Sequence, residues 1–282
     1  MTTPLVYFVG AGPGDPELIT VKGHRLLHEA DYILYTGSLV PEALFDGLQG
    51  IVEDSKGLDI HQILELLSSH AKNGEKVVRV HTGDPAVYGA VQEQRARLLA
   101  EGIESVVVPG VTSALAAAAA VNAELTLPDL TQTIIISRTE GRTAMPDGEK
   151  LRDLAKVGNS SLCLYLSATL TDKVARELID GGRSPDTPVA VVQYASIQSR
   201  QRVLRCTLET LAHEMKEAGI RAQAMLLIGP ALDPSIRSQI GAFDSRLYAR
   251  DFSHRYRKAG DGESESTPRN IDKDLQNTLN RT

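Results

Sequence analysis

The chain has 282 residues, 42% of them hydrophobic and 23% charged, with a formal net charge of −6. This composition is typical of a globular chain long enough for two domains, and no apolar run approaches the roughly 20 residues of a membrane span. The excess of acidic residues and the lack of a cluster of basic residues argue against binding to nucleic acid. We therefore expect neither a membrane nor a nucleic-acid partner.

The N-terminal residues and the cysteines indicate a cytoplasmic protein. The chain starts Met1-Thr2-Thr3-Pro4, which lacks a basic segment followed by an apolar one, so we expect no signal peptide. Cys163 and Cys206 are the two cysteines. Cys163 lies in an apolar run, where a buried, reduced thiol is expected. Without paired Cys and His spacings, we expect no structural zinc or other metal.

Apolar segments alternate with amphipathic ones along the first part of the chain, which is typical of a parallel sheet covered by helices. Strands are predicted at residues 5–9, 32–35, 76–80 and 105–108, and helices at 20–30, 60–71, 87–100 and 112–121. Residues 122–132, which include Pro128, form the predicted linker. The second series has strands at 133–137, 161–166, 188–193, 200–206 and 224–228, and helices at 149–156, 171–180 and 208–218.

These patterns predict an α/β protein of two α/β domains, with a cofactor cleft between them. The first domain covers residues 1–121 and has a mainly parallel sheet, whereas the second covers residues 133–242 and has a mixed sheet. Residues 243–282 form a charged tail with few apolar residues. Such a segment cannot bury enough apolar surface to order itself, and we expect disorder from about residue 255 onward.

The first predicted strand leads into a glycine-rich turn, Gly10-Ala11-Gly12-Pro13-Gly14-Asp15-Pro16. Such turns bring the backbone close to nucleotide-like ligands. A dinucleotide-binding motif would need G-x-G-x-x-G, with the helix starting inside it. Here Pro16 disfavours helical geometry at Asp15, and Thr20 is the better N-cap. An NAD(P)-dependent oxidoreductase is therefore the weaker alternative.

Two further glycine-containing turns follow predicted strands, at residues 81–89 and 109–113. In the first, Gly83 permits close backbone approach, while Asp84 either binds a ribose diol or caps the next helix. In the second, Thr112 is an N-cap candidate, and the backbone N–H groups either bind a ligand or serve the fold alone. Because all three turns follow strands of one parallel sheet, we expect them to converge on one edge.

Together, the segments G-A-G-P-G-D-P-E-L-I-T, H-T-G-D-P-A-V-Y-G and P-G-V-T-S resemble the tetrapyrrole (class III) S-adenosylmethionine-dependent methyltransferases, over about residues 5–234. The segments at 130–133, 137–143 and 166–170 look most like the branch that methylates carbon 11 of precorrin-4 in cobalamin synthesis. The resemblance implies S-adenosylmethionine folded between two domains, a tetrapyrrole substrate and a homodimer. It leaves open whether the substrate carries cobalt. Another tetrapyrrole methyltransferase and a non-catalytic binding protein are the alternatives.

The resemblance also implies roles for particular residues. Pro13 would contact the cofactor and shape the substrate trough. The ribose and methionine portions would be held by Gly83, Asp84 and Val87, next to the contacts of Thr112 and Ser113. The residues that would close over the adenosine are Leu166, Ala195 and Ala224. Ala195 replaces a glycine common in relatives, and a backbone contact would survive that change.

A substrate rich in carboxylates calls for local positive charge in an acidic protein. Arg138 and Arg142 follow the predicted strand 133–137, and their guanidinium groups could pair with propionates or acetates. The alternative is that both are solvated surface charges. Asp15 is a further candidate for substrate contact, and the less favoured cations are Lys22, His24 and Arg79. Methyl transfer from a sulfonium needs mainly alignment and exclusion of water, so no catalytic triad or general base is assigned.

Overall fold

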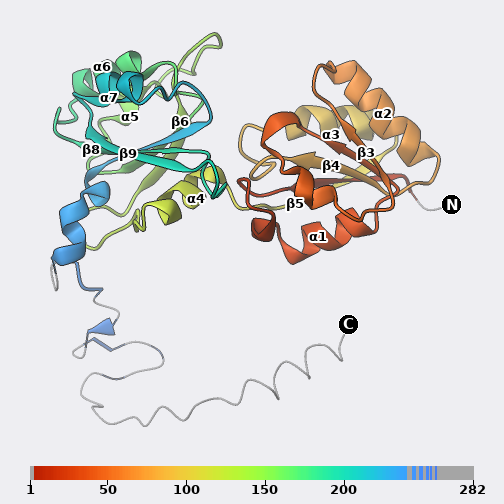
Figure 1. Cartoon of the computed structure of the whole chain (residues 1–282), viewed down its shortest axis with the longest axis horizontal. Coiled ribbons are helices and arrows are strands. Elements are labelled where there is room, and N and C mark those ends of the chain that lie inside the picture. Colours follow the sequence, from red (N-terminus) through yellow and green to blue (C-terminus); the bar gives the residue numbers. More distant parts are fainter. Residues whose placement is uncertain are drawn as a thin grey trace. The chain divides into compact units, whose positions relative to one another are not determined.

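The structure is a computed structural model that describes residues 3–239, 243–245, 248, 249, 252, 253, 255 and 258. Residues 1–237 form one compact unit, which contains two five-stranded sheets (Figure 1). The predicted disorder of the tail falls almost entirely outside the described residues. Among the helices that the structure describes, none has the length and hydropathy needed to cross a membrane.

The first sheet is parallel throughout and has the strand order β3-β2-β4-β1-β5. Its strands are β1 (Leu5–Gly10), β2 (Tyr32–Tyr35), β3 (Ile51–Asp54), β4 (Val77–His81) and β5 (Glu104–Val108). Four of them match the predicted strands to within one residue at each end, whereas β3 was missed. As an edge strand it buries little, and Ile51 is 60% exposed. It therefore lacks the apolar alternation by which strands are found.

Helices cover both faces of this sheet (Figure 1). They are α1 (Val21–His28) on one face, and α2 (Ile60–Lys72) and α3 (Val91–Ala100) on the other. Thr20 caps α1 as predicted, because its side chain accepts a hydrogen bond from the Gly23 N–H at 3.1 Å. The start of α3 lies four residues after the prediction, since Tyr88 and Ala90 adopt positive φ. This sheet and α1–α3 are called the N-lobe.

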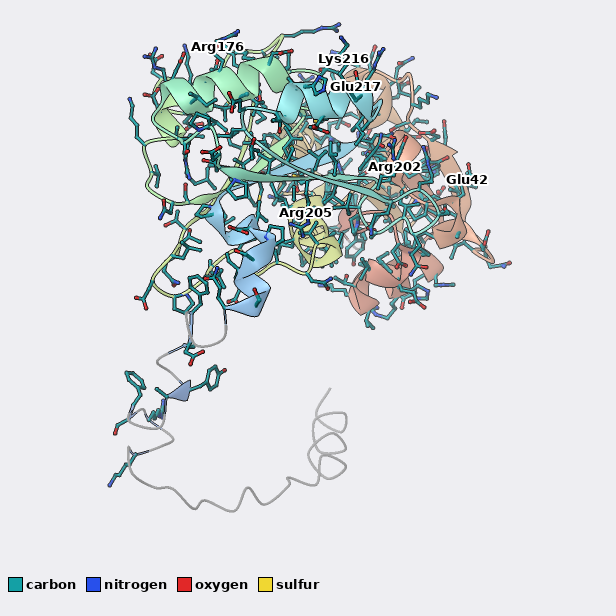
Figure 2. All side chains as sticks on the ribbon, turned by 60° about the vertical axis from the view of Figure 1, so that its left-hand side comes forward. Glu42, Arg176, Arg202, Arg205, Lys216 and Glu217 are labelled. Carbon is teal, nitrogen blue, oxygen red and sulfur yellow. The ribbon has the colours of Figure 1, made fainter. Side chains whose placement is uncertain are left out.

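The second sheet is mixed, as predicted, with the order β6-β7-β10-β8-β9. Only the β6–β7 pairing is parallel. Its strands are β6 (Ile134–Arg138), β7 (Ser161–Tyr165), β8 (Pro188–Gln193), β9 (Arg202–Thr207) and β10 (Ala224–Ile228). One face is covered by α5 (Leu151–Leu154), α6 (Thr171–Asp180) and α7 (Leu211–Glu217). Arg176 and Lys216 are exposed on α6 and α7 (Figure 2).

The alanine-rich helix α4 (Ser113–Ala120) covers the opposite face of this second sheet (Figures 1 and 2). Ala114 and Ala117 are fully buried in a cluster with Cys163 and Leu227. Small side chains allow this close packing. The domain boundary expected at residue 121 assigns this helix to the first domain, but the helix packs on the second sheet. The chain therefore passes from the first sheet to the second near Thr112. This second sheet and α4–α7 are called the C-lobe.

Candidate active site

The three glycine-containing turns meet at the carboxyl ends of the N-lobe strands, as the sequence predicted. The Gly83 N–H donates to the Gly12 carbonyl at 2.7 Å, and Gly12 donates back to Gly83 at 3.2 Å. A Cβ atom on Gly110 would lie 2.1 Å from the Gly83 carbonyl oxygen and 2.8 Å from the Gly10 Cα. The contact is between backbones, so only glycine fits at Gly110.

Asp84 joins the second turn to the third. Its Oδ1 accepts a hydrogen bond from the Ala86 N–H at 2.7 Å, and its Oδ2 accepts one from the Gly110 N–H at 3.0 Å. The first of these closes the turn at residues 85–88 and is not the helix cap that the sequence suggested, because α3 starts only at Val91 and has no side-chain cap. The second fixes the distance between two motifs that are far apart in the chain.

The first turn contacts the C-lobe. The Asp15 N–H donates to Ser196 Oγ at 3.0 Å, while the Asp15 carboxylate accepts from the Glu17 N–H at 2.9 Å and caps a short 3-10 helix. A Cβ atom on Gly14 would lie 2.4 Å from Ile197 Cγ1. The glycine therefore makes room for a C-lobe side chain.

Tyr165 ends β7 and contacts the start of α4 within the C-lobe. Its hydroxyl hydrogen-bonds Thr112 Oγ1 and accepts from the Ala114 N–H at 3.1 Å. Burial raises the pKa of this phenol. Its ring lies 5.4 Å from that of Tyr88. The start of α4 is thus held by the end of β7.

Residues of both lobes line a cavity of about 700 Å³, a size typical of small-molecule sites. Every residue that the sequence assigned to the cofactor contributes to its wall. These residues are Pro13, Gly83, Asp84, Val87, Thr112, Ser113, Leu166, Ala195 and Ala224. Their contacts with the cofactor remain a prediction, but the fold does gather them around one space.

Backbone strain marks the same cavity. Five non-glycine residues in its wall have positive φ, between 49° and 55°. They are Tyr88, Ala90, Leu166, Tyr194 and Gln223. Such strained residues cluster at ligand sites, where the surrounding structure holds them in place. Sequence reasoning found only Leu166 among them, because nothing local in the sequence signals a positive φ at these residue types.

The N-lobe wall of the cavity is polar and deeply buried. It contains Arg79, His81 and Gln94, which are 3%, 5% and 3% exposed. Burial lowers the pKa of Arg79 to about 10, with Tyr32 and Asp54 opposing the shift. Burial and the charge of Arg79 lower the pKa of His81 to about 3. At neutral pH the arginine is therefore charged and the histidine neutral. Gln94 belongs to no motif and was not foreseen.

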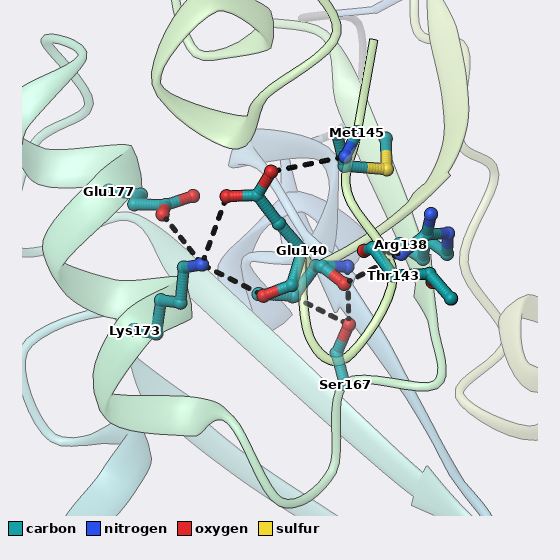
Figure 3. A network of polar contacts seen from close by, with 8 residues as sticks. Arg138, Glu140, Thr143, Met145, Ser167, Lys173 and Glu177 are labelled. Carbon is teal, nitrogen blue, oxygen red and sulfur yellow. Dashed lines mark hydrogen bonds and ion pairs between the residues drawn. The ribbon is translucent and has the colours of Figure 1, made fainter.

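The residues predicted to contact substrate lie outside the cavity wall. Arg138 is bound to its own loop, where Nη2 donates to the Ala144 carbonyl at 2.8 Å and Nη1 to the Thr143 carbonyl at 3.1 Å (Figure 3). Burial raises the pKa of Tyr88, and the charge of Arg138 opposes this shift. Arg142 is exposed, and the substrate roles of both arginines and of Asp15 stay predictions.

Glu140 and Lys173 hold the same loop against α6. Glu140 Oε1 accepts from the Met145 N–H at 3.1 Å, and Lys173 Nζ donates to the Glu140 carbonyl at 2.8 Å (Figure 3). The less favoured cations Lys22 and His24 lie on α1, and neither lines the cavity. Of the cations named from the sequence, only Arg79 reaches it.

Known proteins resemble the chain over nearly its whole described length. A sequence profile of the tetrapyrrole (corrin/porphyrin) methylases matches residues 5–212. The cobalt-precorrin-4 C(11)-methyltransferase of Priestia megaterium is 49% identical over 255 residues, which cover 90% of this chain and 97% of that enzyme.

Solved structures agree with this assignment. A cobalamin biosynthetic enzyme, cobalt precorrin-4 methyltransferase, superposes with a TM-score of 0.79 and 50% identity, covering 82% of this chain and 96% of that one. Uroporphyrin-III C-methyltransferase from Thermus thermophilus, complexed with S-adenosyl homocysteine, has a TM-score of 0.68 and 34% identity, covering 80% and 98%. The chain therefore belongs to the tetrapyrrole (corrin/porphyrin) methylases.

Proposed function

We propose that this chain transfers a methyl group from S-adenosylmethionine to carbon 11 of precorrin-4 or cobalt-precorrin-4, giving the corresponding precorrin-5, in cobalamin biosynthesis. The observation that carries the proposal is the cavity, whose wall gathers every residue assigned to the cofactor. The identity of 49% over 90% of the chain to an enzyme named for this reaction supports the choice of substrate.

The cavity wall fits an adenosine-containing cofactor. Pro13, Val87 and Leu166 supply apolar contact, and the Asp84 carboxylate has lone pairs left to accept from ribose hydroxyls. A Cβ atom built on Gly83 finds no neighbour nearer than 3.8 Å, so that side of the turn is open. S-Adenosylmethionine would supply a methyl group activated by its positive sulfur.

The protein's contribution is alignment and protection from water. Carbon 11 must meet the methyl carbon in line with the sulfur, as one carbon–carbon bond forms and one sulfur–carbon bond breaks. Holding two reactants in such geometry contributes up to about 7–11 kcal/mol in favourable cases. The surrounding structure holds the strained backbone at Tyr88 and Leu166 in place, and the apolar side chains of the wall would exclude water.

We further propose that the enzyme is a cytoplasmic homodimer. The resemblance to the family supports the dimer, and the edge strand β5 leaves Val106 and Val107 more than one-third exposed. Light scattering on the purified chain should give twice the mass of 30.4 kDa. A monomer at micromolar concentration would contradict the assembly but not the reaction.

Incubation with labelled S-adenosylmethionine and a panel of tetrapyrroles tests the reaction. Precorrin-4 or cobalt-precorrin-4 should gain one methyl group, and NMR should place it on carbon 11. The relative rates on the two substrates decide whether cobalt is required. Methylation of uroporphyrinogen III alone would overturn the substrate assignment. Tight binding of NADH without binding of S-adenosylhomocysteine would overturn the reaction class.

A further inference from the structure

Arg79 in the N-lobe wall of the cavity has an unused hydrogen-bonding edge. Its Nη1 donates to Ser55 Oγ at 2.9 Å and to the Leu34 carbonyl at 3.3 Å, which ties β4 to β2 and to the end of β3. Its Nε is buried without a partner, and Nη2 makes no hydrogen bond within the described part of the chain. Nε and Nη2 together form a planar fork that matches the two oxygens of a carboxylate.

Among the described residues no carboxylate contacts this guanidinium directly, although the charge of Asp54 favours its charged form. None of the ion pairs among the described residues includes Arg79. The two carboxylates at the end of β3 hydrogen-bond other groups, since Glu53 accepts from the Tyr32 hydroxyl at 2.8 Å and Asp54 accepts from the Gly37 N–H at 3.0 Å. A buried charge without a partner is costly, so this position favours an anionic ligand.

His81 and Gln94 add further unpaired groups to the same wall. His81 Nε2 and Gln94 Oε1 are buried without partners, although Gln94 Nε2 donates to the Ala90 carbonyl at 3.3 Å. With Arg79 Nε they make up three of the six such atoms found in the described residues. Buried polar atoms are nearly always hydrogen-bonded in native proteins. Their concentration in one cavity wall indicates a polar group that arrives with a ligand.

We propose that Arg79, assisted by His81, binds one carboxylate side chain of the tetrapyrrole substrate within the N-lobe part of the cavity. The proposal rests on the proposed function for the nature of the substrate. Ile60 and Ile63 line the same part of the cavity and offer apolar contact to the ring. The inner anchor for the substrate is therefore Arg79 on the central strand β4, while Arg138 at the end of β6 and Arg142 in the following loop lie outside the cavity wall.

The variant Arg79→Lys keeps the positive charge but loses the fork. We expect the KM for the tetrapyrrole to rise at least tenfold, while the Kd for S-adenosylhomocysteine, measured by calorimetry, stays within twofold. Gln94→Glu places a competing carboxylate in the same wall, and it should raise KM similarly even if Arg79→Lys folds poorly. Arg95→Lys is the matched control, because Arg95 lies on α3 outside the cavity wall and bonds Ser105.

Direct binding separates this proposal from the proposed function. In the presence of S-adenosylhomocysteine, cobyrinic acid, a corrin with free carboxylates, should bind the wild type at least tenfold more tightly than Arg79→Lys. Cobinamide, in which these groups are amides, should bind both equally. Such a result without methylation of precorrin-4 would overturn the function alone. Equal affinity of both proteins for cobyrinic acid, or a loss confined to S-adenosylhomocysteine binding, would overturn the subsite.

Discussion

His81 is a titratable side chain that the fold keeps neutral, and this makes stability depend on pH. Burial lowers its pKa from 6.5 to about 3. Below pH 6.5 the unfolded chain therefore takes up a proton that the folded protein binds only near pH 3. The unfolding free energy falls through this window as the pH decreases, by at most about 1.4 kcal/mol per pH unit. Above pH 6.5 both states are neutral at this position and the effect vanishes.

We therefore predict that His81→Asn flattens the pH dependence of stability. Between pH 7 and pH 5 the variant should gain about 2 kcal/mol relative to the wild type, as measured by urea unfolding at each pH. His213→Asn, at an exposed position, should keep the wild-type slope. Parallel slopes for His81→Asn and the wild type would show that His81 is not held neutral in the folded state.

Asp84 shows which residue roles could be foreseen. The sequence suggested a helix cap or a ligand contact, whereas the structure shows a turn contact with the Ala86 N–H and a bond to the Gly110 N–H. The bond to Gly110 depends on how three distant turns come together, so no local pattern contains it. Gln94, Tyr194 and Gln223 were missed for the same reason, because they reach the cavity through the packing of whole elements.

At the scale of elements, the meeting of the three turns depends on glycine. We predict that Gly110→Ala costs about 3 kcal/mol or more of unfolding free energy and abolishes binding of S-adenosylhomocysteine. The added Cβ would lie 2.1 Å from the Gly83 carbonyl oxygen, a backbone atom that no rotamer change can move. Gly141→Ala is the control, because its Cβ would meet only the Leu170 side chain, at 3.4 Å. Wild-type stability of Gly110→Ala in urea would refute the contact.

The loop after β6 provides a second prediction at this scale. Arg142 is exposed, and its replacement by alanine should raise the substrate KM about two- to fivefold without changing Tm, as expected for an exposed ion pair. Arg138→Ala should lower kcat as well, because its bonds to the Thr143 and Ala144 carbonyls shape the loop. Steady-state kinetics measure both, with Arg176→Ala on α6 as the control. An unchanged KM and kcat after both replacements would end the proposed role of this loop.

Most helices and strands could be predicted because the capping residues and the apolar pattern of a segment indicate the same element. Thr20 caps α1 ahead of an apolar face, and β10 was located to the residue. The predictions failed where tertiary packing, and not the local sequence, determines the structure. The edge strand β3 has little apolar burial, and α4 follows an N-lobe strand in sequence but packs on the second sheet. A helix of alanines carries no information about which sheet it covers, since its hydrophobic surface is nearly uniform.

At the scale of the molecule, residues 1–237 combine two lobes around one cavity. The Asp15–Ser196 hydrogen bond joins the first turn to a C-lobe loop. The Tyr165–Ala114 hydrogen bond joins β7 to the start of α4. The cavity wall draws on both lobes, with Pro13 and Val87 from one and Ala195 and Ala224 from the other. A ligand that fills this space contacts both lobes at once, so its binding stabilises the folded unit as a whole.

We accordingly predict a large thermal shift with S-adenosylhomocysteine. At a free concentration of 100 times its Kd, a ligand that binds only the folded state adds about 2.7 kcal/mol. For a unit of this size, that corresponds to a rise in Tm of roughly 5–10 °C. NADH at the same concentration should shift Tm by less than about 1 °C, because the first turn lacks the dinucleotide spacing. The shift should also shrink in Asp84→Asn, whose amide cannot accept from both the Ala86 and Gly110 N–H groups. Equal shifts with NADH and S-adenosylhomocysteine would mean that the cavity recognises adenosine alone.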